Sequence, residues 1–258
     1  MSYESNKEVL IKPQRYTAID ALRGAAILNM ILYHAVWDLV YIFGIEIAWF
    51  KTSAAYIWQQ GICWTFIFLS GFCFSLSKKP LKRGIYIFSA GLLISLVTML
   101  FIPQEKIIFG VLTLIGSCAL LQVPFRKVLQ KINPLLGMIG SFAIFFIIRN
   151  VNQGYLGFES FNICKLPDSL YFNTLTAYLG FPPAQFHSAD YFSLFPWLFL
   201  YLSGYFTYGV FKKYDLLRHL KTKQVYILNW IGRKSLVIYM LHQPILYLLL
   251  YIFFFITK

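Results

Sequence analysis

Four ionisable residues lie on one side of the first apolar stretch of the chain, and their types suit proton transfer. They are Asp20, Arg23, His34 and Asp38. At about 100° per residue of an α-helix, the four positions fall within roughly 60° of one another. Charged side chains are costly in the apolar part of a bilayer, so they usually face a bundle interior or a watered cavity and often serve function. The stripe therefore predicts a polar site between helices.

His34 is the candidate general base of this stripe. Asp38 lies one helical turn further on and could accept a hydrogen bond from one imidazole nitrogen, which would leave the other nitrogen free as a base. Asp20 and Arg23 are three residues apart near the start of the helix, a spacing suited to an ion pair. The alternative is that these groups only neutralise one another and fix helix packing.

The composition indicates a membrane protein. Of 258 residues, 59% are hydrophobic and 13% are charged, whereas soluble domains average about 45–50% apolar and about 25% charged residues. The formal net charge of +13 comes from short basic clusters between apolar runs, which is typical of cytoplasmic loops. These clusters could hold coenzyme A phosphates or contact anionic lipid head groups. We expect no nucleic-acid partner and no metal site.

The apolar runs predict an all-α, polytopic helical bundle with about seven membrane spans. We expect residues 1–17 to form a cytoplasmic N-terminal segment and residues 18–258 to form a single transmembrane domain. We expect one long connection, at residues 150–189, to form a lid, and its stretch near Leu170–Phe181 could lie at the interface or re-enter the membrane. The predicted spans are 18–43, 54–77, 84–102, 107–123, 134–149, 190–211 and 229–256.

The distribution of Lys and Arg predicts the orientation. With the N-terminus inside, 17 of these residues lie on the inner side and 5 on the outer side, and Arg23 lies within the first span. Basic residues favour cytoplasmic loops. We therefore expect a multi-pass protein of the cell membrane with the 150–189 connection and the C-terminus outside.

Other polar residues could line the same cavity. His242 and Gln243 precede Pro244 in the last predicted span, where the histidine could bind a substrate or cap a backbone carbonyl freed by the proline. Arg233 enters that span from the inner side and could meet phosphates or serve as a positive anchor.

Two residues at the outer start of the sixth predicted span are further candidates. Asp190 could line a substrate site. Trp197 is expected to be an interface anchor, although an exposed aromatic ring could also stack on a sugar.

Four motifs, found in order along the chain, resemble those of a known family. They are Arg15–Gly24 followed by His34, then Phe109–Gly116, then Leu194–Trp197 with Leu202–Tyr205, and finally Trp230–Pro244. Ten residues separate Arg23 from His34, as in the related family-three acyltransferases. The set is most similar to the heparan-alpha-glucosaminide N-acetyltransferase group, especially its short bacterial members. Thr113 departs from the pattern, because many relatives carry a histidine there.

The resemblance implies an enzyme that uses acetyl-CoA or another acyl-CoA as co-substrate. It implies a catalytic role for His34. Together with the stripe, we expect Asp38 to be catalytic beside it, and we expect Arg23, Arg15 and Arg233 to lie near the coenzyme A phosphates. The expected acceptor is an amine or hydroxyl of a carbohydrate-like molecule that arrives from the outer side. The sequence leaves the oligomeric state open.

A membrane transporter for a small molecule or for protons is the alternative. It would use the same polar stripe as a substrate or proton path. Both functions need a polar cavity through a bundle, so the residue types do not separate them, and the motifs favour the enzyme.

Overall fold

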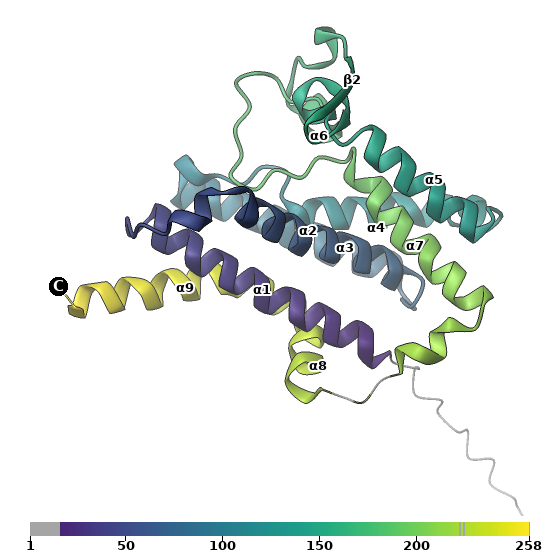
Figure 1. The fold of residues 1–258 in the computed structure, drawn as a ribbon, viewed down its shortest axis with the longest axis horizontal. Coiled ribbons are helices and arrows are strands. Elements are labelled where there is room, and N and C mark those ends of the chain that lie inside the picture. Colours follow the sequence, from purple (N-terminus) through teal and green to yellow (C-terminus); the bar gives the residue numbers. More distant parts are fainter. Residues whose placement is uncertain (1–15, 222, 224, 258) are drawn as a thin grey trace, which may run out of the picture.

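The computed structural model describes residues 16–221, 223 and 225–257. Arg15 and all but the last two residues of the predicted N-terminal segment 1–17 lie outside the described residues. The described chain is mostly helical, as predicted (Figure 1). Its helices and strands are α1 Thr17–Tyr41, α2 Ser53–Phe74, α3 Pro80–Phe101, α4 Val111–Leu129, α5 Pro134–Ile147, β1 Tyr155–Phe158, β2 Phe161–Lys165, α6 Thr174–Leu179, α7 Trp197–Lys213, α8 Tyr226–Arg233 and α9 Ser235–Thr257.

Five of the described helices are long and apolar enough to cross a membrane: α1, α2, α3, α4 and α9. The membrane bundle is thus confirmed, but the expected seven spans are not. Helix α5 has 14 residues and α7 has 17, whereas a perpendicular span needs about 20.

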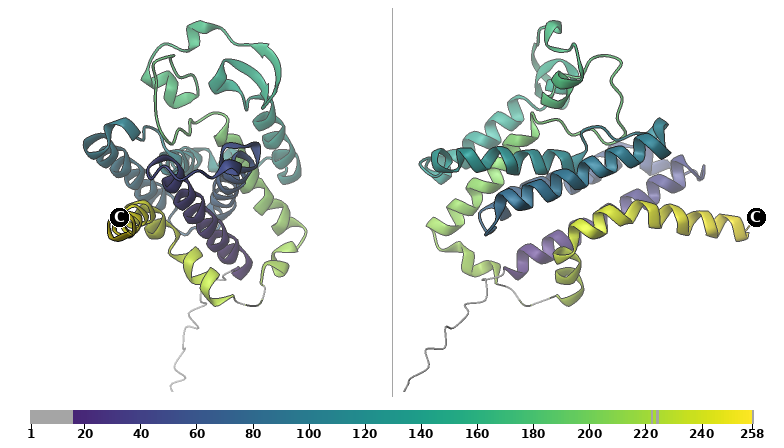
Figure 2. Two further views of the ribbon diagram at one scale, coloured as in Figure 1. Left: turned by 60° about the vertical axis from the view of Figure 1, so that its left-hand side comes forward. Right: turned by 180° about the vertical axis from the view of Figure 1, so that it is seen from behind.

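The last two predicted spans differ from the structure at their starts. Helix α7 begins at Trp197 and not near residue 190, because Pro196 disfavours helical geometry in the residue before it. The run 229–256 is divided into α8 and α9 at Lys234. This break lets α8 pack along α1 while α9 continues in another direction (Figure 2).

Glycines bring two helix pairs into close backbone contact. A Cβ on Gly24 of α1 would lie 2.0 Å from the Leu228 carbonyl oxygen of α8, and one on Gly232 would lie 1.9 Å from that of Asp20. The pair α2 and α7 repeats this arrangement through Gly71 and Gly204. Small residues at helix contacts allow the tight packing that holds membrane bundles together.

The substitution Gly71→Ala should therefore destabilise the protein. Its Cβ would lie 1.8 Å from the Tyr201 carbonyl oxygen, and forcing extra atoms into packed contacts typically costs about 1–3 kcal/mol. We expect a lower melting temperature in detergent. Gly61→Ala on the same helix is the matched control, because no atom of another described residue lies within 4 Å of its new Cβ. Equal melting temperatures for the two variants would contradict the close-packing account.

The main core lies among α2, α4, α5 and α7. Its buried members include Ile67, Leu114, Phe145, Trp197 and Tyr201. Aromatic contacts are frequent within it, for example between Phe145 and Trp197, whose ring centroids are 5.6 Å apart. This cluster joins the start of α7 to the middle of the bundle.

The connection at 150–189 contains more regular structure than its composition suggests. Strands β1 and β2 form an antiparallel hairpin, and an Asn173 capping box begins α6. Figures 1 and 2 show the hairpin and α6 together, beyond the adjoining ends of α5 and α7 and clear of the long helices. Backbone hydrogen bonds from Leu194 and Phe195 to α6 attach this cap to the start of α7.

Candidate active site

Two histidines lie side by side where α1 meets α9. The ring centroids of His34 and His242 are 4.9 Å apart, and the ring planes are inclined at 55°. His242 is buried, with 9% of its surface exposed. The structure thus brings together two candidates from opposite ends of the sequence.

Asp38 is fully buried and is held by α9. The side-chain amide of Gln243 donates a hydrogen bond of 2.6 Å to Asp38 Oδ1. The expected hydrogen bond between Asp38 and His34 is absent among the described contacts, because Gln243 supplies the donor from the facing helix. His34 pairs with His242 and Asp38 pairs with Gln243, so two residues of each helix meet across one contact.

His242 also contacts a backbone carbonyl, but not the one freed by the proline. Its Nδ1 atom lies within hydrogen-bond distance of the Tyr239 carbonyl oxygen. Pro244 lacks an N–H group and would leave the carbonyl of Met240 without its helical donor. The interpretation that His242 caps the carbonyl freed by Pro244 is therefore wrong, because His242 contacts the carbonyl of Tyr239 instead.

A cationic pocket lies at the end of the bundle where α1 begins and α2 ends. Its volume is about 550 Å³, and among the residues that the structure describes, five basic side chains and no acidic one line it. Ser70, Ser77 and Ser235 add hydroxyl groups, and Tyr239 forms part of the wall. The basic residues are Arg23, Lys79, Lys82, Arg83 and Arg233.

Arg23 and Arg233 both line this pocket, so the structure brings these two candidates together. No ion pair joins Arg23 to Asp20 among the residues that the structure describes, so the expected pairing is wrong. The two residues are used differently. Arg23 lines the pocket, whereas the backbone carbonyl of Asp20 packs against Gly232 of α8. Asp20 therefore does not neutralise the positive charge that Arg23 brings to the pocket.

Asp190 lies in the irregular segment before α7, at the N-terminus of α4. The backbone N–H of Val111 donates a hydrogen bond of 3.5 Å to Asp190 Oδ2. Burial raises the pKa of Asp190 from 3.8 to about 6, and the hydrogen bond from Val111 opposes this shift. Val111 also lines the cationic pocket, so Asp190 lies just behind the pocket wall.

This raised pKa predicts a pH-dependent stability. The folded protein binds the Asp190 proton more tightly than the unfolded chain does, so the contribution is full below pH 3.8 and is lost as the pH rises through about 6. Melting temperatures measured between pH 4 and 7.5 should fall less steeply in Asp190→Asn than in the wild type. Asp168→Asn is the control, because the Asp168 side chain is 82% exposed. An unchanged slope in Asp190→Asn would refute this assignment.

Trp197 is not an interface anchor. Only 4% of its surface is exposed, and the guanidinium carbon of Arg149 lies 4.8 Å from its ring centroid. This distance is within the range of a cation–π contact. Trp197 therefore forms part of the core beneath Arg149 and is closed to a sugar.

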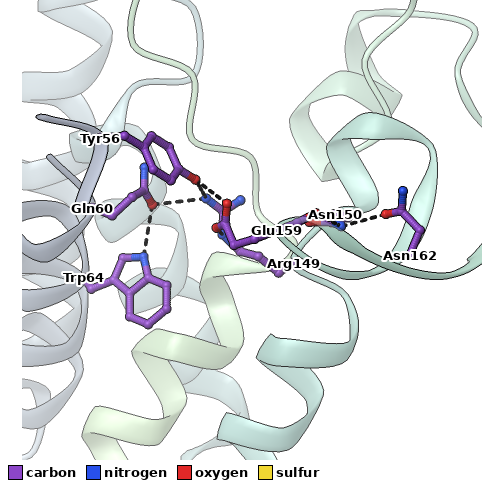
Figure 3. A network of polar contacts seen from close by, with 7 residues as sticks. All are labelled: Tyr56, Gln60, Trp64, Arg149, Asn150, Glu159 and Asn162. Carbon is purple, nitrogen blue, oxygen red and sulfur yellow. Dashed lines mark hydrogen bonds and ion pairs between the residues drawn. The ribbon is translucent and has the colours of Figure 1, made fainter. Parts of the chain in front are cut away.

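Arg149 is the centre of a polar network that the sequence reasoning missed. It donates a hydrogen bond of 3.1 Å to Gln60 and forms an ion pair of 3.5 Å with Glu159. Tyr56 donates a hydrogen bond of 2.7 Å to Glu159 (Figure 3). The network joins α2 to the hairpin, and the available signal was an arginine directly after an apolar run.

The sequence of the chain was compared with models of known protein families. The model of the heparan-alpha-glucosaminide N-acetyltransferase catalytic domain matches residues 15–244, which is most of the chain. The chain belongs to this family. Searches among curated proteins and among solved structures returned no match.

Membership of the heparan-alpha-glucosaminide N-acetyltransferase family confirms the resemblance drawn from the four motifs. Together with the apolar helices, it supports a multi-pass membrane acetyltransferase. The relation to the family-three acyltransferases stays a prediction.

Proposed function

We propose that the protein moves an acetyl or other acyl group from cytoplasmic acyl-CoA to an amine or hydroxyl of a sugar-like acceptor at the outer side of the cell membrane. The cationic pocket is the observation that carries this proposal. Family membership supports acetyl transfer and does not favour the alternative of a transporter.

The pocket suits the phosphates of coenzyme A. Guanidinium groups bind phosphate oxygens with paired hydrogen bonds, and lysines add point charges. Three of the five cations, Arg23, Arg83 and Arg233, are arginines. No acidic residue of the described chain is part of the pocket lining, so an anion would meet a positive field that no lining carboxylate compensates.

One residue of the pocket wall, Tyr239, lies next to the pair His34 and His242. Tyr239 lines the pocket, and its ring centroid lies 5.4 Å from that of His242. Along α1, His34 lies about 16 Å beyond Arg23, a distance of the order spanned by an extended pantetheine arm. Phosphates held at Arg23 would therefore leave the thioester near His34.

His34 would act as the general base. It would take a proton from the acceptor as the nitrogen or oxygen attacks the thioester carbonyl and the coenzyme A thiolate leaves. Asp38 lies one turn away and would stabilise the imidazolium electrostatically, since its hydrogen bond goes to Gln243. Direct transfer and a route through an acyl-imidazole on His34 both use these groups.

The orientation of the protein follows from its basic residues. The five pocket cations lie on the inner side or in the inner part of the first span, as the excess of Lys and Arg on that side predicts. The cap built from residues 150–189 then lies outside, where it would meet the acceptor. Residues 18–258 act as one transmembrane domain in this proposal.

Thermal stabilisation by acetyl-CoA is the first test, because it needs no known acceptor. A ligand that binds only the folded state raises the melting temperature by mass action. We expect saturable stabilisation of the detergent-purified protein by acetyl-CoA, with less stabilisation of Arg23→Ala and no competition from ATP. No shift at millimolar acetyl-CoA would reject the donor proposal and favour the transporter, which vesicle uptake of a labelled solute would then test.

A further inference from the structure

The contact between α1 and α9 holds three polar atoms with no hydrogen-bond partner among the described residues. They are Asp38 Oδ2, His242 Nε2 and Gln243 Oε1, and each is buried. Buried polar atoms without partners are rare in native proteins, and each one calls for an explanation. Figures 1 and 2 show α9 running beside α1, so these atoms lie along one helix contact.

All three atoms are hydrogen-bond acceptors. A backbone carbonyl can only accept, so His242 Nδ1, which contacts the Tyr239 carbonyl, must carry the proton of the neutral ring. His242 Nε2 is then left with a lone pair.

The same reasoning applies to the amide. When the carboxylate of Asp38 is ionised it can only accept; the nitrogen of Gln243 then faces it, at 2.6 Å, and the amide oxygen is left over. The second oxygen of Asp38 is an acceptor as well. The contact is thus deficient in donors.

We propose that Asp38, His242 and Gln243 form a binding site for the N–H or O–H donors of the acceptor and hold its nucleophilic group against His34. This inference rests on the proposed function and adds residue roles to it. His242 is 4.9 Å from His34 between ring centroids, and Asp38 lies one turn beyond His34. A donor-rich group bound here would satisfy the three acceptors and lie next to the base.

The site should reject acceptors without donors. A site that is built to hydrogen-bond a substrate hydroxyl or amine discriminates strongly against an analogue that lacks it, because its own buried groups then stay unpaired. Amines and hydroxyls share this donor chemistry, and D-glucosamine and D-glucose separate the two. A permethylated glucosamine, with a quaternary nitrogen and no hydroxyl group, is the probe without donors.

The test uses thermal stabilisation of the full-length protein in detergent. We expect D-glucosamine or D-glucose to stabilise the wild type and the permethylated probe to have no effect. His242→Leu and the double variant Asp38→Leu/Gln243→Leu should weaken binding of the stabilising sugar by about tenfold or more. Leu248→Ala is the control, because Leu248 is on the same helix with 56% of its surface exposed.

The melting temperature without ligand separates this role from a structural one. Replacing a buried unpaired acceptor, or both members of a polar pair, with apolar groups is close to neutral or stabilising. We therefore expect His242→Leu and the double variant to melt at or above the wild-type temperature. Lower melting temperatures with unchanged sugar binding would indicate a structural role and overturn the inference.

Two further outcomes are decisive. Equal stabilisation of the wild type by the permethylated probe, or no stabilisation by either sugar, would overturn the inference. Acetyl-CoA is added in a separate arm. A wild type that responds to the sugars but not to acetyl-CoA would reject the proposed function while supporting the donor-accepting site.

Discussion

Replacing His34 with alanine is expected to lower the rate of acyl transfer by about 100- to 10,000-fold, the range that a positioned general acid or base typically contributes. The ring of His34 lies beside that of His242, and Asp38 is one turn away on the same helix. His34 is not among the residues that line the cationic pocket, so removal of the imidazole should leave the pocket unchanged. Turnover should therefore fall while the stabilisation by acetyl-CoA is retained, measured by transfer of a radiolabelled acetyl group in reconstituted vesicles.

The control for this prediction is Leu32→Ala. Leu32 is on the same helix with 58% of its surface exposed, so its truncation should leave turnover close to that of the wild type. Full activity of His34→Ala would show that another group removes the proton, even though the family assignment would stand. Loss of acetyl-CoA binding in His34→Ala would instead indicate that the variant has altered the pocket.

Reversing the charge of Arg83 is expected to weaken acetyl-CoA binding by about 10- to 100-fold, because a hydrogen bond to a charged group contributes about 1.5–3 kcal/mol. Arg83 lines the cationic pocket and donates a hydrogen bond of 3.4 Å to the Cys73 carbonyl. In Arg83→Glu a carboxylate would replace one of five cations and would repel the phosphates. The dissociation constant should be measured by isothermal titration at low and at high salt.

Lys78→Glu is the matched control for charge. Lys78 is an exposed neighbour that is not among the pocket's lining residues, so the change in net charge is identical while the pocket stays intact. We expect a small loss of affinity that disappears at high salt, because exposed charges are screened. Similar losses in both variants would mean that the field of the whole inner surface, and not the pocket, attracts the ligand.

The membrane class and most helices could be predicted because bilayers impose a length and a composition on each span. Helix α1 differs from its predicted range 18–43 by only a few residues, since Asp20, Arg23 and His34 do not interrupt its apolar run. The starts of α7 and α9 could not be predicted from hydropathy. Pro196 delays the first, and the packing of α8 on α1 through Gly24 and Gly232 separates the second.

The site was predicted in part. The periodicity of α1 placed His34 and Asp38 on one face, because that relation is local and follows from helical geometry. Helical periodicity could not predict that Asp38 pairs with Gln243 and not with His34, because that pairing depends on which residue of α9 faces α1. Trp197 was misjudged for the same reason: its burial depends on Arg149 and Phe145, which are distant in sequence.

The sequence by itself determined the membrane bundle, the family and the polar stripe of α1, because hydropathy, motif order and helical period are properties of short segments. Tertiary structure alone decided three relations among the described residues: five cations share one pocket, His242 lies against His34, and three acceptors at the α1–α9 contact lack donors. Those relations are set by how the helices pack. Packing depends on contacts between residues far apart in the chain, which no local pattern records.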